Sequence, residues 1–419
     1  MDIDHISEWA KIKGIDVVGT GDFTHYKWIT EIKEKLVEDG SGLLRLKSDN
    51  IMKDCHAAAR NDSIRFMLTS EIACIYKQGP VGSKCRKIHL IIFAPSIETV
   101  DKINVELNKI GNIHSDGRPI LGISAYNLAK LIFGIDERCM VIPAHAWTPW
   151  FSIFGSKSGF DTIEDCFGDL TSKIYAIETG LSSDPEMNWR LSNLDNITLI
   201  SNSDAHSLPN LGREANVFEI DAGKITYDEI CDIIKTKDKK RFPYTIEFYP
   251  EEGKYHFDGH AACNLSIDPF KDVILSGSEG SVMKDCRVAE APRNDNGGRC
   301  PVCRRPMTIG VASQVAKLAD RQTSIQKKSF PGTVHLVPLR EIIANAYGVG
   351  VQSKKVNKLY FELVEKFGSE FHILLDLDEK FLRKNFPERI AQGIINVKNG
   401  DIKIEPGYDG IYGKVNIFG

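Results

Sequence analysis

Side chains that bind metals recur beside short apolar runs in the first half of the 419-residue sequence. Each lies within or directly after a run rich in Ile, Val or Leu, which is the pattern of a buried strand. The residues are Asp22, Glu71, His89, His145, Glu178, Asp204 and His206. Imidazole and carboxylate groups gathered in one place suit divalent transition metals such as zinc, manganese or iron. Two or three such ions activate a water molecule and stabilise the attacking and leaving oxygens of a displacement at phosphorus.

The elements that must position these residues alternate between strand-like and helix-like patterns. The apolar runs are residues 15–18, 64–68, 88–93, 140–142, 174–177 and 197–200. Helical periodicity lies between them, for example at residues 96–107, 124–133 and 227–234. This alternation predicts βα units around a parallel sheet or barrel. Because the carboxyl ends of barrel strands converge on one face, side chains distant in sequence would meet there.

Each of these residues taken alone has a simpler explanation. An acid after a strand is often a helix cap, and a single histidine is often a satisfied core or surface residue. Six or seven such residues at successive strands are harder to explain by capping, so the pattern favours a metal site.

A second group of metal-binding residues lies further along the chain. The four ligands predicted here are His260, Cys263, Cys300 and Cys303. The tight turn of a Cys-x-x-Cys pair lets both thiolates point at one ion, and four such ligands close a structural zinc site. The intervening 36 residues (264–299) contain a Gly-, Ser-, Asp- and Asn-rich loop at 276–298, and Cys286 or His256 could replace one of the ligands. A redox-active or merely buried Cys-x-x-Cys pair is the other interpretation.

Composition describes an ordinary globular protein, with 42% hydrophobic and 26% charged residues. No apolar run approaches the roughly 18 residues of a membrane span, and no signal peptide pattern opens the sequence. The ten cysteines are mostly single, as in a reduced intracellular protein. We therefore expect a cytoplasmic protein with no membrane partner.

Charge is unevenly distributed along the chain. The formal net charge is −4, which does not by itself indicate a nucleic-acid-binding protein. Residues 299–340, however, hold eight Lys or Arg against the single acid Asp320, a local balance of +7. This stretch is a candidate phosphate-binding face, and a solvated loop and helix surface explains it equally well.

The composition changes near residue 243, where 243–259 is rich in aromatic and turn residues. We therefore predict a domain at 1–245 that contains the first group of metal-binding residues, a zinc-binding module with a flexible insertion at 246–329, and a helical domain at 330–419. The last of these opens with helical patterns at 339–347 and 353–367.

Three short segments carry a resemblance to a known superfamily. Residues 19–25 (GTGDFTH), 143–145 (PAH) and 203–206 (SDAH) resemble, in order and spacing, motifs of the PHP superfamily of metal-dependent phosphoesterases. The resemblance implies a distorted (β/α)₇ barrel that holds a multinuclear metal cluster. It implies six metal ligands, namely Asp22, Glu71, His89, His145, Asp204 and His206. Among these, Glu71 would bridge the metals, and Glu71, Asp204 and His206 would be the central catalytic residues.

One departure from the superfamily pattern concerns its opening strand, which bears a His-x-His pair. This sequence contains no His-x-His, and His5 precedes residues 6–13, which have a helical pattern. We therefore expect the first barrel strand to be missing and the metal cluster to be incomplete, through a lost gene start or a degenerate copy. Whether this chain catalyses the reaction as it stands is left open by the sequence.

Longer strings resemble the endonuclease Q family more than histidinol phosphatases. They are residues 115–122, 144–151, 178–185, 211–216 and 407–413. The resemblance implies hydrolysis of the phosphodiester 5′ to uracil, hypoxanthine, xanthine or an abasic site, in double- or single-stranded DNA. It implies structural Zn²⁺, Zn²⁺ in the active site as well, and Mg²⁺ or Mn²⁺ for activity. A sliding clamp is a speculative further partner, although residues 416–419 show no clear clamp-binding peptide.

An enzyme that acts at a damaged base flips that base into a pocket before the chemistry. The candidate contacts to DNA or to the base are Trp147, Trp150, Ser182, Ser183, Asn188, Arg304 and Arg305. Packing at the rim of the site explains Trp147 and Trp150 equally well.

Two other functions compete with this interpretation. A PHP phosphatase of a small phosphomonoester explains the barrel but gives no purpose to the zinc module or the basic stretch. The second alternative is a catalytically impaired protein that binds damaged DNA, and the missing His-x-His strand favours it.

Overall fold

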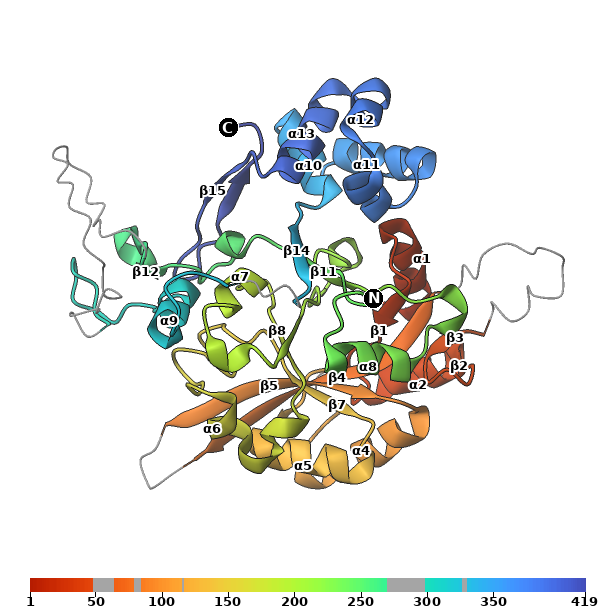
Figure 1. Ribbon diagram of the computed structural model, residues 1–419, viewed down its shortest axis with the longest axis vertical. Coiled ribbons are helices and arrows are strands. Elements are labelled where there is room, and N and C mark those ends of the chain that lie inside the picture. The colour runs from red at the N-terminus through yellow and green to blue at the C-terminus, as the bar shows by residue number, and fades with distance from the viewer. Residues whose placement is uncertain (48–63, 79–83, 115–116, 270–297, 326–329) are drawn as a thin grey trace.

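The structure is a computed structural model that describes residues 1–47, 64–78, 84–114, 117–269, 298–325 and 330–419. Within these residues the chain forms a mixed α/β body that carries a helical C-terminal region, seen at the top of Figure 1. No helix in this part of the chain is long and apolar enough to cross a lipid bilayer.

A seven-stranded mixed sheet forms the base of the body. Its strands are β1 (Val17–Gly19), β2 (Leu36–Glu38), β3 (Leu44–Leu46), β4 (Arg65–Lys77), β5 (Cys85–Ala94), β6 (Ile120–Leu121) and β7 (Met140–Pro143). The long strand β4 organises the sheet, because its first three residues pair in parallel with β1 and its last ten pair antiparallel with β5. Strand β7 in turn pairs antiparallel with β5.

The mixed pairing differs from the parallel sheet predicted from the βα alternation. A parallel crossover needs about a dozen residues or more, and the connection from Lys77 to Cys85 is shorter than that. The chain therefore turns back on itself between β4 and β5, and the two strands pair antiparallel. Closure of the strands into a seven-stranded barrel stays a prediction.

Helices cover this sheet, and four of them confirm the helical patterns predicted at 6–13, 96–107, 124–133 and 227–234. They are α1 (Ile3–Lys13), α2 (Tyr26–Lys35), α4 (Ile97–Ile110), α5 (Ala125–Ile135), α6 (Ile163–Phe167) and α8 (Tyr227–Thr236). The hydroxyls of Ser96, Ser124 and Thr226 each accept a hydrogen bond from the backbone N–H three residues later. Such caps satisfy N–H groups that a helix leaves unpaired at its start.

Smaller sheets connect the body to the rest of the chain. Strands β8 (Ala176–Glu178) and β9 (Thr198–Ile200) pair in parallel. Strand β11 (Tyr244–Glu247) lies between β10 (Ala215–Val217) and β14 (Gly332–His335). The predicted domain boundaries near 245 and 330 therefore fall at two strands of one sheet, and they stay predictions.

Short helices fill the connections. They are α7 (Pro185–Asn188), η2 (Gly168–Lys173), η3 (Ser192–Leu194), η4 (Leu208–Asn210), η5 (Ala222–Lys224), η6 (Pro250–Glu252), η7 (Ala261–Cys263) and η8 (His372–Asp376).

A small β-rich unit lies beside the body and contains the paired cysteines. Its hairpin consists of β12 (Asp258–His260) and β13 (Leu265–Ile267), and helix α9 (Val311–Leu318) follows. Among the described residues, its own apolar cluster has three buried members, Leu265, Cys300 and Met307.

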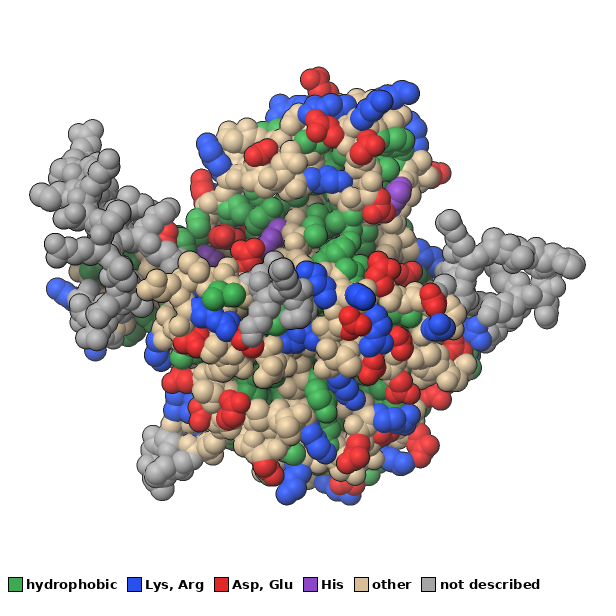
Figure 2. Space-filling model, viewed as in Figure 1, with side chains coloured by type: hydrophobic (Ala, Val, Ile, Leu, Met, Phe, Trp, Pro, Cys, Tyr) green, Lys and Arg blue, Asp and Glu red, His purple; other side chains and the backbone are tan. Residues whose placement is uncertain are grey.

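The C-terminal region has a core of its own. Its helices are α10 (Leu339–Tyr347), α11 (Lys354–Phe367), α12 (Glu379–Asn385) and α13 (Glu388–Asn399), and strands β15 (Lys403–Glu405) and β16 (Lys414–Asn416) follow. Helices α10 and α11 confirm the two predicted helical patterns. Trp9 and Ile12 of α1 pack against this core. Figure 2 shows hydrophobic side chains gathered in the waist between these helices and the body below.

A buried ion pair fastens α1 to the C-terminal helices. Lys13 Nζ lies 2.6 Å from Glu370 Oε2, and their side chains are only 2% and 4% exposed. Two hydrogen bonds also reach the Glu370 carboxylate. The Tyr360 hydroxyl donates to it at 2.6 Å, and the Leu339 backbone N–H donates at 2.9 Å. Because the carboxylate is out of contact with water, removal of the lysine leaves an uncompensated buried charge.

We expect Lys13→Met to lower the free energy of unfolding by about 3–5 kcal/mol, because it breaks a buried pair from one side. Urea unfolding at pH 7 measures this change. The matched control is Lys33→Met, whose pair with Asp101 is 40% and 50% exposed and should contribute under about 1 kcal/mol. Equal losses in the two variants would contradict the role given to Lys13.

Candidate metal centre

The register of β4 against β5 places a glutamate beside a histidine. Ala73 pairs with His89 and Glu71 pairs with Ile91, so all four side chains lie on one face of the sheet. Glu71 and His89 are therefore diagonal neighbours across the two strands. His145 follows β7, the strand that pairs with β5 on its other side. Glu71 was predicted to follow its strand, but β4 continues past it to Lys77.

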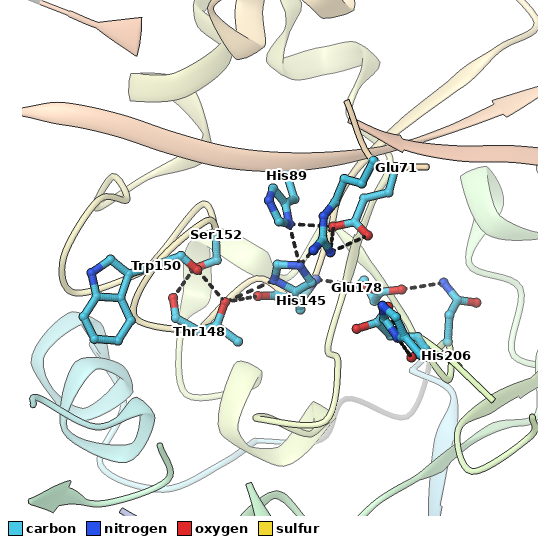
Figure 3. A network of polar contacts seen from close by, with 11 residues as sticks. Glu71, His89, His145, Thr148, Trp150, Ser152, Glu178 and His206 are labelled. Atoms are coloured by element: carbon cyan, nitrogen blue, oxygen red, sulfur yellow. Dashed lines mark hydrogen bonds and ion pairs between the residues drawn. The ribbon is translucent and has the colours of Figure 1, made fainter. Parts of the chain in front are cut away.

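Three side chains from these elements converge on one point (Figure 3). Glu71 Oε1 lies 2.6 Å from His89 Nδ1 and 3.2 Å from His145 Nε2, and the two ring nitrogens are 3.1 Å apart. Their ligand atoms all lie within 4.8 Å of one another. One carboxylate oxygen and two imidazole nitrogens form a donor set that suits zinc, manganese or iron.

The charges of the three groups are set by burial and by each other. Burial raises the pKa of Glu71, but hydrogen bonds with His145 and His89 outweigh it and hold that pKa well below its usual value. Burial lowers the pKa of His89. Burial also acts to lower the pKa of His145, but the nearby carboxylates, first of all Glu71, raise it overall. An ionised Glu71 and a neutral His89 are the forms that bind a cation, and a cation competes with protons for His145.

Backbone strain marks three of the predicted ligands. Asp22, His145 and Asp204 have φ angles of 47°, 30° and 41°. Left-handed conformations cost a non-glycine residue about 1–3 kcal/mol and concentrate at functional sites. Gly180 leaves room for His145 in this conformation: a Cβ built on Gly180, itself at φ 63°, would lie 2.6 Å from His145 Cβ. Only glycine fits at position 180.

Glu178 supports His145 from behind. Its Oε2 accepts the backbone N–H of His145 at 2.8 Å, and its Oε1 accepts the side-chain amide of Asn202 at 2.9 Å. The carboxyl is 3% exposed, and burial raises its pKa to about 7. Glu178 is a positioning residue, because it fixes the backbone that aims the imidazole.

Arg118 lies at the site but was not predicted as a site residue from the sequence. Its Nη1 lies 3.3 Å from Glu71 Oε2, and its side chain is 39% exposed. The only sequence signal was the string 115–122, in which it lies. The preceding Gly117 brings Asp22 to the same loop, because a Cβ at Gly117 would meet Asp22 Oδ2 at 2.2 Å. A guanidinium that is open to solvent beside a metal-binding carboxylate suits a phosphate ligand.

Asp204 and His206 lie together but outside the three-residue group. His206 Nδ1 is 3.0 Å from the Asp204 carbonyl and 3.7 Å from Asp204 Oδ1, and the two side chains are 75% and 41% exposed. Arg213 fixes this loop by donating to the carbonyls of Ser203 and Asp204. Asp204 is close enough to contribute to the raised pKa of His145. The structure thus gathers three of the six predicted ligands, and the roles of Asp22, Asp204 and His206 stay predictions.

Three of the predicted DNA or base contacts, Trp147, Ser183 and Asn188, are enclosed within the protein. The Trp147 indole is fully buried and donates to Asn188 Oδ1 at 2.8 Å. Ser183 is also buried and donates to the Thr179 carbonyl. Ser182 is half-buried, and Trp150 is 38% exposed. In this conformation Trp147, Ser183 and Asn188 shape the loop behind His145, so contact with a base would require the loop to move.

The four residues predicted as zinc ligands meet at one place. The ligand atoms of His260, Cys263, Cys300 and Cys303 all lie within 4.8 Å of one another, and Cys303 Sγ is 3.6 Å from His260 Nδ1. The hairpin β12–β13 supplies the first two, and the turn closed by the bridge between Arg299 and Pro306 supplies the cysteine pair.

Neither alternative ligand belongs to this described group. His256 is buried, and burial lowers its pKa to about 4. Cys286 lies outside the described residues.

The basic stretch 299–340 does not form one continuous face. Arg304 and Arg305 are exposed on the turn that carries the cysteine pair. Arg321 instead pairs with Asp195 at 2.7 Å, and Arg340 is 4% exposed beneath the Tyr360 ring. Of the described charges in this stretch, Arg299, Arg304 and Arg305 are exposed at the cysteine turn, and Lys317 is exposed on α9. Lys327 and Lys328 lie outside the described residues.

Known proteins resemble this chain over nearly its whole length. The family described as the MJ0043 C-terminal domain matches residues 338–401. The uncharacterized protein MJ0043 of Methanocaldococcus jannaschii is 31% identical over 274 residues, which are 65% of this chain but only 31% of that protein. The uncharacterized protein YqxK of Bacillus subtilis is 27% identical over 417 residues, covering 97% of this chain and 90% of that protein.

Two solved structures share the fold. One is the lesion-specific endonuclease PfuEndoQ from Pyrococcus furiosus, with a TM-score of 0.79 and 29% identity over 99% of this chain and 90% of that chain. The other is endonuclease Q in complex with a 27-mer duplex substrate that has an abasic lesion at the active site, with the same TM-score and identity over 99% and 91%. These matches confirm the resemblance to the endonuclease Q family.

We expect Glu71→Gln to weaken Mn²⁺ binding by at least about tenfold, because the neutral amide removes the charge on which both imidazoles converge. Isothermal titration calorimetry with Mn²⁺ measures the affinity. Glu98→Gln is the control, since that carboxylate is 79% exposed on α4. Unchanged affinity in Glu71→Gln would exclude this group as the main metal site.

Proposed function

We propose that this chain, whose likeness to endonuclease Q extends over nearly its whole length, is a metal-dependent DNA repair endonuclease. It hydrolyses the phosphodiester 5′ to uracil, hypoxanthine, xanthine or an abasic site. The observation that carries the proposal is the convergence of Glu71, His89 and His145 on one point. The shared fold, with a TM-score of 0.79 to a lesion-specific endonuclease, supports the same class of reaction.

The donor set fits a catalytic metal, because it combines an ionised carboxylate with imidazole nitrogens within ligand reach. When bound, such a metal activates water and stabilises charge at phosphorus. The residues of the chain hold and orient the components. Glu71 and the two imidazoles provide ligands, with Asp22, Asp204 and His206 as further ligands from the same family motifs. Glu178 fixes His145.

Two residues at the rim act on the substrate. Arg118 presents an exposed guanidinium beside Glu71, where it would bind a non-bridging phosphate oxygen. His206 is held through Nδ1 by the Asp204 carbonyl, which leaves Nε2 for a ligand or for a proton. No side chain needs to act as the nucleophile, since water fills that role.

The second metal-binding group serves structure rather than chemistry. Four N and S ligands form the closed set of a structural Zn²⁺ site. The described residues around them form a separate apolar cluster of three buried side chains, and so small a cluster favours a unit that is held together by a metal. The exposed Arg304 and Arg305 on the same turn place positive charge where a DNA backbone can contact it.

The domain assignment follows from these roles. Residues 1–245 form the catalytic domain, 246–329 the zinc-binding module, and 330–419 the helical domain that contributes to DNA binding.

A nicking assay on end-labelled DNA with one uracil, hypoxanthine or abasic site tests the function. We expect Mn²⁺- or Mg²⁺-dependent cleavage just 5′ to the lesion, and Asp204→Asn should lower it by on the order of 100-fold or more, since it weakens a metal ligand. The matched control is Asp221→Asn, an aspartate that is 77% exposed and pairs with Lys224 on the surface. Because the sequence contains no His-x-His, the assay includes a form extended by the codons upstream of Met1.

Either of two results would contradict the endonuclease proposal and favour another function. Damage-selective binding without cleavage by either form indicates a DNA-binding protein. Hydrolysis of p-nitrophenyl phosphate without cleavage of DNA indicates a phosphatase.

Cys303→Ser should lower the bound zinc by about one equivalent per chain, since it removes one of four ligands. Elemental analysis measures the metal, and limited proteolysis should show new cleavage near residues 258–310 as the small unit loosens. Cys85→Ser, at an exposed cysteine on β5, should change neither result. Equal zinc content in the two variants would contradict the zinc assignment.

A further inference from the structure

A line of aromatic rings and one lysine crosses the surface between the two metal-binding groups. The rings of Trp150 and Tyr255 meet edge to face with centroids 5.6 Å apart. Lys254 Nζ lies 5.4 Å from the Tyr255 ring and 5.8 Å from the Tyr412 ring. Trp150 and Tyr412 are 38% and 68% exposed, and Lys254 is exposed too. Three segments far apart in sequence thus contribute to one continuous strip.

One end of the strip is tied to the Glu71 group. Thr148 donates its hydroxyl to the Trp150 carbonyl at 2.9 Å, and the same oxygen lies 3.1 Å from His145 Nδ1. Trp150 therefore sits on the loop that aims the imidazole (Figure 3).

The other end is tied to the cysteine group through the C-terminal turn 407–413. Asp409 accepts hydrogen bonds from the Ala261 backbone N–H at 2.7 Å and from the Thr308 hydroxyl at 2.5 Å. The Gly413 N–H donates to the Glu252 carbonyl at 3.0 Å. The turn is thereby fixed against the hairpin that supplies His260, with Tyr412 pointing into solvent.

The charge along the strip is positive. Lys254 follows two acids, but Glu252 is 8% exposed and burial raises its pKa to about 9, while burial also raises the pKa of Glu251. Burial thus disfavours the charged form of both acids, and Lys254 is the exposed charge at this part of the strip. Arg304 and Arg305 add exposed charge on the cysteine turn beyond it.

We propose that Trp150, Tyr255, Lys254 and Tyr412 form a track for an unpaired DNA strand that runs from the metal centre to the cysteine turn. The exposed rings of Trp150 and Tyr412 offer faces on which nucleobases stack. The half-buried Tyr255 lies between Trp150 and Lys254. The interleaved ammonium pairs with phosphate. An enzyme that extrudes a base must hold unstacked nucleotides beside its active site, and the track meets that need. This inference rests on the proposed function for the identity of the strand.

Fluorescence anisotropy with a labelled, lesion-free oligothymidylate tests the track with the full chain and without cleavage. Tyr412→Ala should weaken binding at least fivefold, whereas Tyr412→Phe, which keeps the stacking face, should bind as the parent does. Tyr26→Ala is the matched control, because that tyrosine is 49% exposed on α2. Lys254→Ala should reduce the slope of log affinity against log salt by about 0.7, the value for one phosphate contact on a single strand.

The outcomes separate the track from the endonuclease proposal. If Tyr412→Ala and Lys254→Ala bind the oligonucleotide as the parent does, the track is wrong even when the chain cleaves DNA. If Tyr412→Ala weakens a fully paired duplex as much as the single strand, the surface does not select unpaired bases, and the inference also fails. If the parent chain binds no DNA of either kind, both proposals fail together.

Discussion

A half-buried carboxylate that two imidazoles approach at hydrogen-bonding distance constrains much of the surrounding structure. Glu71 lies within the sheet, where an isolated charge would be costly. The register of β4 on β5 supplies His89 as its diagonal neighbour. His145 reaches the same oxygen only because its backbone takes a left-handed conformation, which Gly180 accommodates. Glu178 then occupies the space behind His145 and holds its N–H. The positions of these residues are therefore explained by the position of one atom, Glu71 Oε1.

The two metal-binding groups are linked by the C-terminal turn. Residues 407–413 lie at the end of the chain but pack on the hairpin that carries His260 and Cys263. The same turn presents Tyr412 toward Lys254. The body is connected to the C-terminal helices as well, because β14 pairs with β11 and Lys13 of α1 forms an ion pair with Glu370. The body, the small β unit and the C-terminal helices are therefore held by hydrogen bonds and ion pairs at several separate places, so the spacing between the two metal-binding groups is fixed by the fold.

The local elements could be predicted from the sequence because their signals are local. Ser96 and Ser124 cap the helices that their patterns predicted, and α10 has the predicted bounds. The direction of strand pairing could not be predicted from alternation, since it depends on the short connection between β4 and β5. The grouping of Glu71, His89 and His145 followed from their positions on neighbouring strands. Arg118 was missed because a single arginine in a loop has no periodic or spacing signal. The different surroundings of the arginines in the basic stretch could not be predicted either. Arg321 pairs with Asp195 and Arg340 lies against Tyr360, and both partners lie outside that stretch of sequence.

The most direct test of the metal centre is anomalous diffraction from crystals grown with Mn²⁺, recorded near the manganese absorption edge. The geometry predicts a peak at ligand distance, about 2.0–2.2 Å, from Glu71 Oε1, His89 Nδ1 and His145 Nε2. A peak at any other position, with this group binding no manganese, would contradict the assignment of the convergent carboxylate and imidazoles as the metal centre.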